Sequence, residues 1–154
     1  LSELIQDARV LDLFCGSGGL GMEALSRGAS LAHFVDRSFK ALSAVRENVT
    51  LCGFQEKAII TCQDTFRFLR HYREFGGEPF DVVFASPPYR SADPQRLLDA
   101  ISEAQVTAPG GFICLEYSRH TPSPISSFLK LQRRKVLGET VMEVWETPSL
   151  SSDE

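Results

Sequence analysis

Strand-like runs of apolar residues alternate with helix-like segments along almost the whole chain, and this alternation limits the fold more than any other feature. Strand patterns lie near residues 9–14, 31–36, 57–62, 80–86, 111–117, 132–138 and 141–147. Helical patterns lie near 19–27, 38–52, 65–74, 94–106 and, more weakly, 122–129. Such alternation predicts an α/β fold: a doubly wound, Rossmann-like, mostly parallel sheet with helices on both faces.

The last two strand patterns are separated by only a few residues, Gly138 and Glu139 among them. Because so short a connection cannot cross over the sheet, the two strands must pair as a C-terminal antiparallel hairpin. The chain has 154 residues, of which 43% are hydrophobic, and this suits a single domain. We expect one seven-stranded domain over residues 1–150 and a frayed tail over 151–154.

A buried-strand pattern over residues 10–13 runs into a glycine-rich loop and then into a helix. Gly16, Gly18 and Gly21 satisfy the G-x-G-x-x-G spacing of nucleotide-binding folds. In that pattern the first two glycines allow a tight turn and a close approach to a ligand, and the third allows a helix to pack closely on a strand. The loop therefore predicts a nucleotide site.

Two carboxylates near this loop help to choose the cofactor. Asp36 ends the next strand pattern about 20 residues after Gly16, where a dinucleotide enzyme uses an acid to bind ribose hydroxyls. Asp12 lies beneath the loop, where its charge would repel a pyrophosphate but suits the ammonium of a methionine group. The pair favours S-adenosylmethionine, and a NAD-dependent oxidoreductase stays open as a rival.

The motif Ser86-Pro87-Pro88-Tyr89 follows the fourth strand pattern. Each proline restricts its own backbone and favours an extended conformation in the residue before it, so the motif is stiff. Neither proline donates a hydrogen bond, which leaves the carbonyls of Ser86 and Pro87 and the serine hydroxyl as acceptors. With a tyrosine ring for stacking, this arrangement suits the exocyclic amine of a nucleobase. A turn with a core tyrosine is the alternative.

Several segments together resemble the bacterial 16S ribosomal RNA guanine-N2 methyltransferase family of the RsmD type. They are RVLDLFCGSGGLGMEALSRGAS and FVDRSFKALSAVREN within residues 9–48, Cys62-Gln63-Asp64, FDVVFASPPY over 80–89, Ala108-Pro109-Gly110-Gly111, Glu116, and residues 137–145. The resemblance implies the class I methyltransferase fold. It also implies methyl transfer from S-adenosylmethionine to the N2 amine of a guanine in 16S ribosomal RNA.

The chain departs from this family at two points. Members usually carry Asp-Pro-Pro-Tyr or Asp-Pro-Pro-Phe where this chain has Ser86, and they begin with a basic segment that is absent before Leu1, which suggests an excised domain. The serine form is similar to that of cytosine-N4 DNA methyltransferases. Adenine-N6 or cytosine-N4 methylation of DNA is therefore an alternative, and a catalytically silent RNA-binding module is another.

Ligands of such sheets bind beyond the carboxyl ends of the strands, where these motifs fall. We expect the glycine loop with Asp12 to hold the methionine end, Asp36 the ribose, and Asp64 the adenine amine, although Asp64 also suits a helix N-cap. The expected cofactor site comprises Asp12, Phe14, Cys15, Gly16, Ser17, Gly18, Asp36, Arg37, Asp64, Thr65 and Phe66. The expected catalytic residues are Ser86, Pro87, Pro88 and Tyr89. Arg90 is expected to contact RNA, whereas Glu116 either faces the substrate or pairs with a neighbour such as Arg119.

Composition narrows the choice of partners. The net charge of −4 gives little general attraction for phosphate, although Arg67, Arg70 and Arg73 recur along one helical segment. The four cysteines lack metal-ligand spacing, so we expect no metal, and we expect scattered histidines such as His33 at surface or boundary positions. No apolar run approaches the ~20 residues of a membrane span. We expect a cytoplasmic monomer, with ribosomal RNA or the assembling small ribosomal subunit as its partner.

Overall fold

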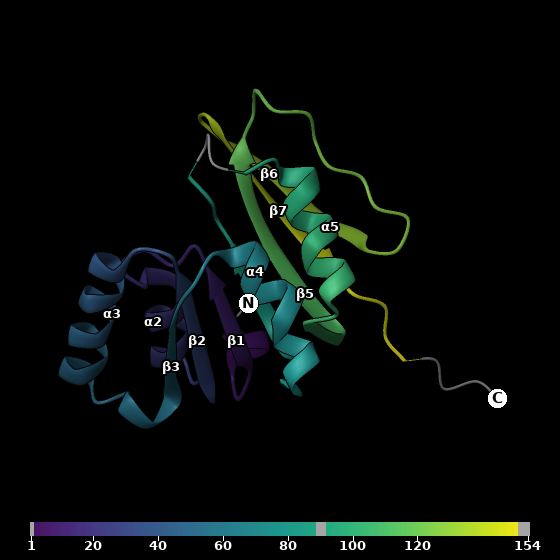
Figure 1. Cartoon of the computed structure of the whole chain (residues 1–154). Helices are drawn as coiled ribbons and strands as arrows, with labels where there is room; N and C mark the ends of the chain where they lie inside the picture. The colour runs from purple at the N-terminus through teal and green to yellow at the C-terminus, as the bar shows by residue number, and fades with distance from the viewer. Residues whose placement is uncertain (1, 89–91, 151–154) are drawn as a thin grey trace.

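The computed structural model describes residues 2–88 and 92–150, and it confirms the predicted α/β fold (Figure 1). The strands are β1 (Arg9–Leu13), β2 (Leu31–Asp36), β3 (Ala58–Cys62), β4 (Phe80–Ala85), β5 (Thr107–Ser118), β6 (Lys130–Leu137) and β7 (Thr140–Glu146). The helices are α1 (Ser2–Ile5), α2 (Gly19–Ser26), α3 (Phe39–Cys52), α4 (Thr65–Tyr72) and α5 (Pro94–Ala104), with short 3-10 helices η1 (Gln55–Lys57) and η2 (Arg73–Phe75). Within the described ranges, no helix is long and apolar enough to cross a membrane.

The strands form one sheet in the order β3-β2-β1-β4-β5-β7-β6. The first five in this order pair in parallel, and β7 pairs antiparallel with both β5 and β6, as predicted for the hairpin. Successive side chains of β1 point to opposite faces, so Val10 and Leu11 enter different cores. The core that contains Val10 is shared with α2 and α3, and the core that contains Leu11 is shared with α4 and α5 (Figure 1). Helices therefore cover both faces of the sheet.

The weak helix predicted over 122–129 is wrong, because this segment contains no helical turn. Pro122 and Pro124 each favour an extended conformation in the residue before them. The side chain of Gln95 in α5 holds the segment from outside, since it donates to the Ile125 carbonyl and accepts from the Ile125 N–H, both at 2.8 Å. The strand predicted over 111–117 is longer than expected and begins at Thr107.

His33 lies in the core and not at the surface or boundary position expected for it. Its side chain is 6% exposed, and its Nε2 lies 2.7 Å from the Thr61 hydroxyl. The rings of Phe68, Tyr72 and Phe80 contact the imidazole edge to face. Burial, and then the nearby positive charge of Arg9, lowers the pKa of His33 to about 4, so the imidazole is neutral at neutral pH.

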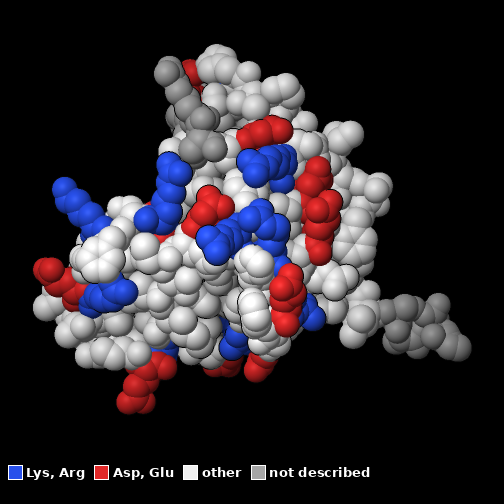
Figure 2. All heavy atoms as spheres, in the orientation of Figure 1, with Lys and Arg blue, Asp and Glu red and all other residues white. Residues whose placement is uncertain are grey.

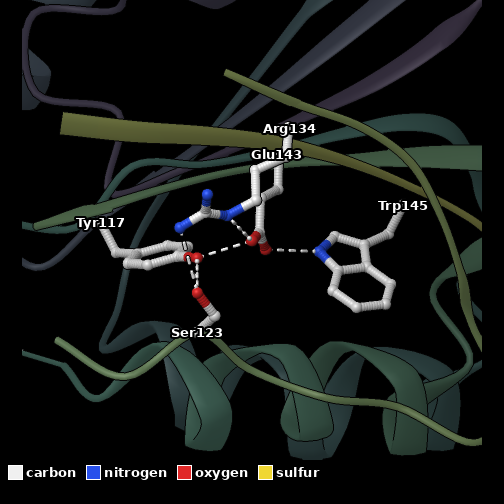
Figure 3. Close-up of polar contacts among 5 residues, drawn as sticks. All are labelled: Tyr117, Ser123, Arg134, Glu143 and Trp145. Atoms are coloured by element: carbon white, nitrogen blue, oxygen red, sulfur yellow. Dashed lines mark hydrogen bonds and ion pairs between the residues drawn. The ribbon is translucent and has the colours of Figure 1, made fainter. Parts of the chain in front are cut away.

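A buried polar network ties the C-terminal strands to the loop after β5 (Figure 3). Glu143 is 2% exposed; its carboxylate accepts from the Tyr117 hydroxyl at 2.6 Å and from the Trp145 indole N–H at 2.9 Å. The Arg134 guanidinium forms an ion pair with the same carboxylate at 3.3 Å. The Ser123 hydroxyl lies 3.1 Å from the tyrosine oxygen and accepts from Arg134. The loop is therefore fixed against β5, β6 and β7.

Candidate active site

A cavity of about 440 Å³ opens at the carboxyl ends of β1 to β4. It lies where β1 and β4 are neighbours and the strand order reverses, which is where open α/β sheets bind their ligands. Its walls are Phe14, Gly16, Asp36, Arg37, Asp64, Thr65, Phe66, Ser86, Pro87 and Pro88. Every one of these belongs to the predicted site, so the fold brings seven of the expected cofactor residues and the Ser86-Pro87-Pro88 part of the motif to one cavity.

The glycine loop owes its path to backbone conformations that favour glycine. Gly16 has φ 56° and Gly18 has φ 87°, and Gly18 is the N-cap residue of α2. A Cβ on Gly16 would meet no atom within 4 Å, so open space lies beside the backbone on the cavity wall. A Cβ on Gly21 would lie 2.3 Å from the Phe34 ring. The predicted role of the third glycine in close helix–strand packing is confirmed.

Backbone N–H groups fix two carboxylates at the cavity wall. Asp36 accepts from the N–H of Gly16 at 2.9 Å through one oxygen and from the N–H of Ser38 at 2.8 Å through the other. Asp64 accepts from the N–H of Arg67 at 3.1 Å, which confirms its predicted N-cap role at α4. A carboxylate oxygen has two lone pairs, so both residues keep acceptor capacity beyond these backbone bonds.

Asp12 lies beneath the glycine loop, outside the cavity wall. It is 2% exposed and accepts from the Gly21 N–H at 2.9 Å, so it joins β1 to the first turn of α2. Burial raises the pKa of this carboxyl to about 7; the bond from Gly21 lowers it, and the charge of Asp36 raises it further. Three other predicted loop residues, Cys15, Ser17 and Gly18, also stand outside the wall.

Three residues were predicted to contact the substrate and have not yet been placed: Tyr89, Arg90 and Glu116. Tyr89 and Arg90 lie outside the described residues. Glu116 is half-buried on β5 and does not line the cavity. Its alternative partner, Arg119, forms an ion pair with Glu139 instead, at 3.7 Å.

Arg96 lies beside the cavity, against one of its lining residues, and no sequence pattern pointed to it. It lies in the first turn of α5, and its guanidinium carbon is 3.9 Å from the centroid of the Phe66 ring. The ring itself belongs to α4 and lines the cavity. Phe66 and Arg96 are 30 residues apart and meet only because α4 packs against α5. A local sequence pattern therefore could not predict their contact.

Two solved structures with this architecture are putative methyltransferases. The protein yhhF from Escherichia coli matches with a TM-score of 0.87 and 26% identity, over 97% of this chain and 82% of its own. The protein SMU.776, complexed with SAH, matches with a TM-score of 0.73 and 15% identity, over 94% of this chain and 47% of its own, which is a likeness of fold alone. The strand order, the cavity and these likenesses define the chain as a class I methyltransferase, and the SAH of that neighbour agrees with the predicted cofactor.

The chain belongs to the family described as Conserved hypothetical protein 95, whose model matches residues 1–146, and the predicted family is thereby confirmed. A putative rRNA methyltransferase, YlbH of Bacillus subtilis, is 38% identical over 141 residues, which are 90% of this chain and 75% of that protein. The ribosomal RNA small subunit methyltransferase D of Buchnera aphidicola is 25% identical over 90% of this chain and 71% of its own. The ribosomal RNA large subunit methyltransferase I of Photobacterium profundum is 39% identical over 74% of this chain, which spans only 30% of that longer protein.

Proposed function

We propose that this protein transfers a methyl group from S-adenosylmethionine to the exocyclic N2 amine of a guanine in 16S ribosomal RNA. The observation that carries the proposal is that Ser86-Pro87-Pro88 shares one cavity with the carboxylates of Asp36 and Asp64. Ribosomal RNA as the substrate is supported by the relatives, one of which is named for the small subunit and another for the large. The guanine target rests on the resemblance to the RsmD type.

The residues on the cavity wall fit S-adenosylmethionine. Each oxygen of Asp36 accepts one backbone N–H and has a second lone pair for a ribose hydroxyl. Asp64 caps α4 and has acceptor capacity left for the adenine amine. The open space beside Gly16 allows a ligand to approach the backbone. The bound cofactor supplies an electrophilic methyl group on a sulfonium.

Ser86 and Pro87, which line the same cavity, provide acceptors for the amine of the target base. The Ser86 hydroxyl and the Pro87 carbonyl take the two amine hydrogens, which favours the pyramidal nitrogen whose lone pair attacks in line. As the nitrogen–carbon bond forms, the carbon–sulfur bond would break and leave a neutral thioether. The methylated nitrogen then loses its extra proton to solvent, and no covalent bond to the enzyme forms. Positioning of the amine against the methyl group supplies much of the acceleration. Serine is a neutral acceptor, so it holds the amine more weakly than a carboxylate would.

Ser86 favours one alternative within the same chemistry. Because the serine form resembles cytosine-N4 DNA methyltransferases, an amine of cytosine or adenine in DNA is the competing target. All three bases present a planar ring with an amine, so the acceptors described above serve each of them. The identity of the methylated nucleoside separates these targets.

Asp36→Ala should weaken binding of S-adenosylmethionine by about 1.5–3 kcal/mol, or about 10- to 150-fold, because charge-assisted hydrogen bonds to the ribose are lost. Isothermal titration calorimetry measures this, and a parallel titration with NADH tests the oxidoreductase alternative. Asp99→Ala, which removes an exposed carboxylate of α5 outside the cavity, serves as the control. Equal affinities of the wild type and Asp36→Ala would remove Asp36 from the site.

Tyr89→Ala should lower the rate of methyl transfer by about 5- to 150-fold, the equivalent of ~1–3 kcal/mol for a lost stacking contact with the base. Affinity for the cofactor should stay nearly unchanged, because the ring is assigned to the base. Tyr89→Phe keeps the ring and should keep most of the rate. Single-turnover transfer of a tritiated methyl group to RNA measures all three proteins. A parallel collapse of cofactor affinity would assign the ring to the core instead.

A further inference from the structure

We propose that Arg96 binds a phosphate of the RNA strand next to the target nucleotide, an inference that rests on the proposed function. The guanidinium of Arg96 stacks on the Phe66 ring, with its carbon 3.9 Å from the ring centroid. The same ring forms part of the cavity wall. A single aromatic side chain therefore separates the cavity from a permanent positive charge on the outer surface.

The acidic residues near Arg96 in sequence make their hydrogen bonds to another residue, Gln95. Asp93 accepts from the Gln95 N–H as the N-cap of α5, and Asp99 accepts from the Gln95 side-chain amide at 3.0 Å. In the part of the chain that the structure describes, no ion pair joins Arg96 to a carboxylate. Stacking uses the flat face of a guanidinium and leaves the N–H groups at its edge available to an anion.

A phosphate is the anion that this position fits. A base that enters the cavity leaves its sugar and phosphates outside, and the carboxylates of Asp36 and Asp64 on the wall would repel them. Arg37, also on the wall, likewise has no carboxylate partner within the described ranges. Figure 2 shows Lys and Arg side chains interspersed with Asp and Glu over the face of the molecule in view. The planar donor fork of an arginine matches phosphate geometry, so local positive charge can hold the strand although the net charge is −4.

Binding of a fluorescently labelled single-stranded RNA, measured by anisotropy over a range of salt concentrations, tests this. Arg96→Gln should lower the affinity about five- to tenfold, and the slope of log K against log salt should shrink by about 0.7, the share of one phosphate on a single strand. KM for RNA should rise by the same factor, with kcat and cofactor affinity unchanged. Arg96→Lys keeps the charge and should restore most of the salt slope.

The matched control is Arg46→Gln, because Arg46 also lies over a phenylalanine, 5.7 Å from the Phe39 ring centroid, but away from the cavity. It should leave RNA affinity and salt slope unchanged. An unchanged slope in Arg96→Gln would overturn the proposal, and so would a fall in its cofactor affinity, which would show that Arg96 only supports Phe66. Wild-type protein that binds RNA in this Arg96-dependent way without methylating it would refute the proposed function alone.

Discussion

Asp12→Asn should stabilise the ligand-free protein by up to about 4 kcal/mol above pH 7 and change its stability little near pH 4. The Asp12 carboxyl keeps its proton up to about pH 7 in the folded protein, whereas an ordinary aspartate releases it near pH 3.8. Between these values the folded state binds more protons than the unfolded chain, so stability falls as pH rises. Asparagine removes this ionisation, and its amide oxygen still accepts from the Gly21 N–H.

Urea unfolding of both proteins between about pH 4 and pH 8 measures this effect. The informative quantity is the difference in the free energy of unfolding between the two proteins at each pH. Neither pH profile alone is enough, because His33 changes the stability of both proteins in the opposite direction to Asp12. Its pKa is lowered from 6.5 to about 4, so the unfolded chain binds the extra proton in that window and stability rises with pH. His33 is present in both proteins, so its contribution cancels when one unfolding free energy is subtracted from the other. The remaining pH dependence is that of Asp12. A difference that does not vary with pH would contradict the expected ionisation of Asp12.

Glu143→Ala should lower the free energy of unfolding by about 3–5 kcal/mol, the usual cost of removing one partner from a buried ionic network. The substitution leaves the Trp145 indole N–H without its acceptor and leaves the Tyr117 hydroxyl with Ser123 as its remaining partner. It also leaves Arg134 without its carboxylate partner. Typical domains have only about 5–15 kcal/mol of stability, so the variant should unfold at much lower urea concentration.

Two further variants make this result interpretable. Glu143→Gln keeps an acceptor oxygen and should cost less than the alanine. Glu139→Ala removes a carboxylate of the same hairpin that is 62% exposed and pairs with Arg119 and His120, and it should change stability little, because exposed ion pairs are screened by solvent. If Glu143→Ala cost no more than Glu139→Ala, the network would contribute nothing to holding the C-terminal strands.

Local patterns were sufficient to predict the architecture and the walls of the cavity. The period of apolar residues and the turn chemistry determine most element boundaries, and the order of a doubly wound sheet brings the ends of β1 to β4 together. Asp36 and Ser86 end strand patterns and Asp64 lies two residues after one, so their meeting at one edge of the sheet follows from the topology alone.

Features that depend on packing between distant segments could not be predicted in this way. The contact of Arg96 with Phe66 arises only from the packing of α4 against α5. His33 is buried because aromatic residues from α4 and β4 surround it. The described segment 122–129 is not helical, because its prolines outweigh a weak helical period of apolar residues. The hydrogen bonds of the Gln95 side chain to the Ile125 backbone also fix this segment in its non-helical path.

The destination of the methyl group is the most direct test of the proposed activity. The protein is incubated with tritiated S-adenosylmethionine and either partly assembled small ribosomal subunits, naked ribosomal RNA or duplex DNA, and the labelled nucleoside is identified by mass spectrometry. We expect N2-methylguanosine from 16S ribosomal RNA, and much less of it in the same time with Ser86→Ala and Tyr89→Ala combined. N6-methyladenine or N4-methylcytosine from DNA would contradict the proposal and show that Ser86 is the better guide to the target.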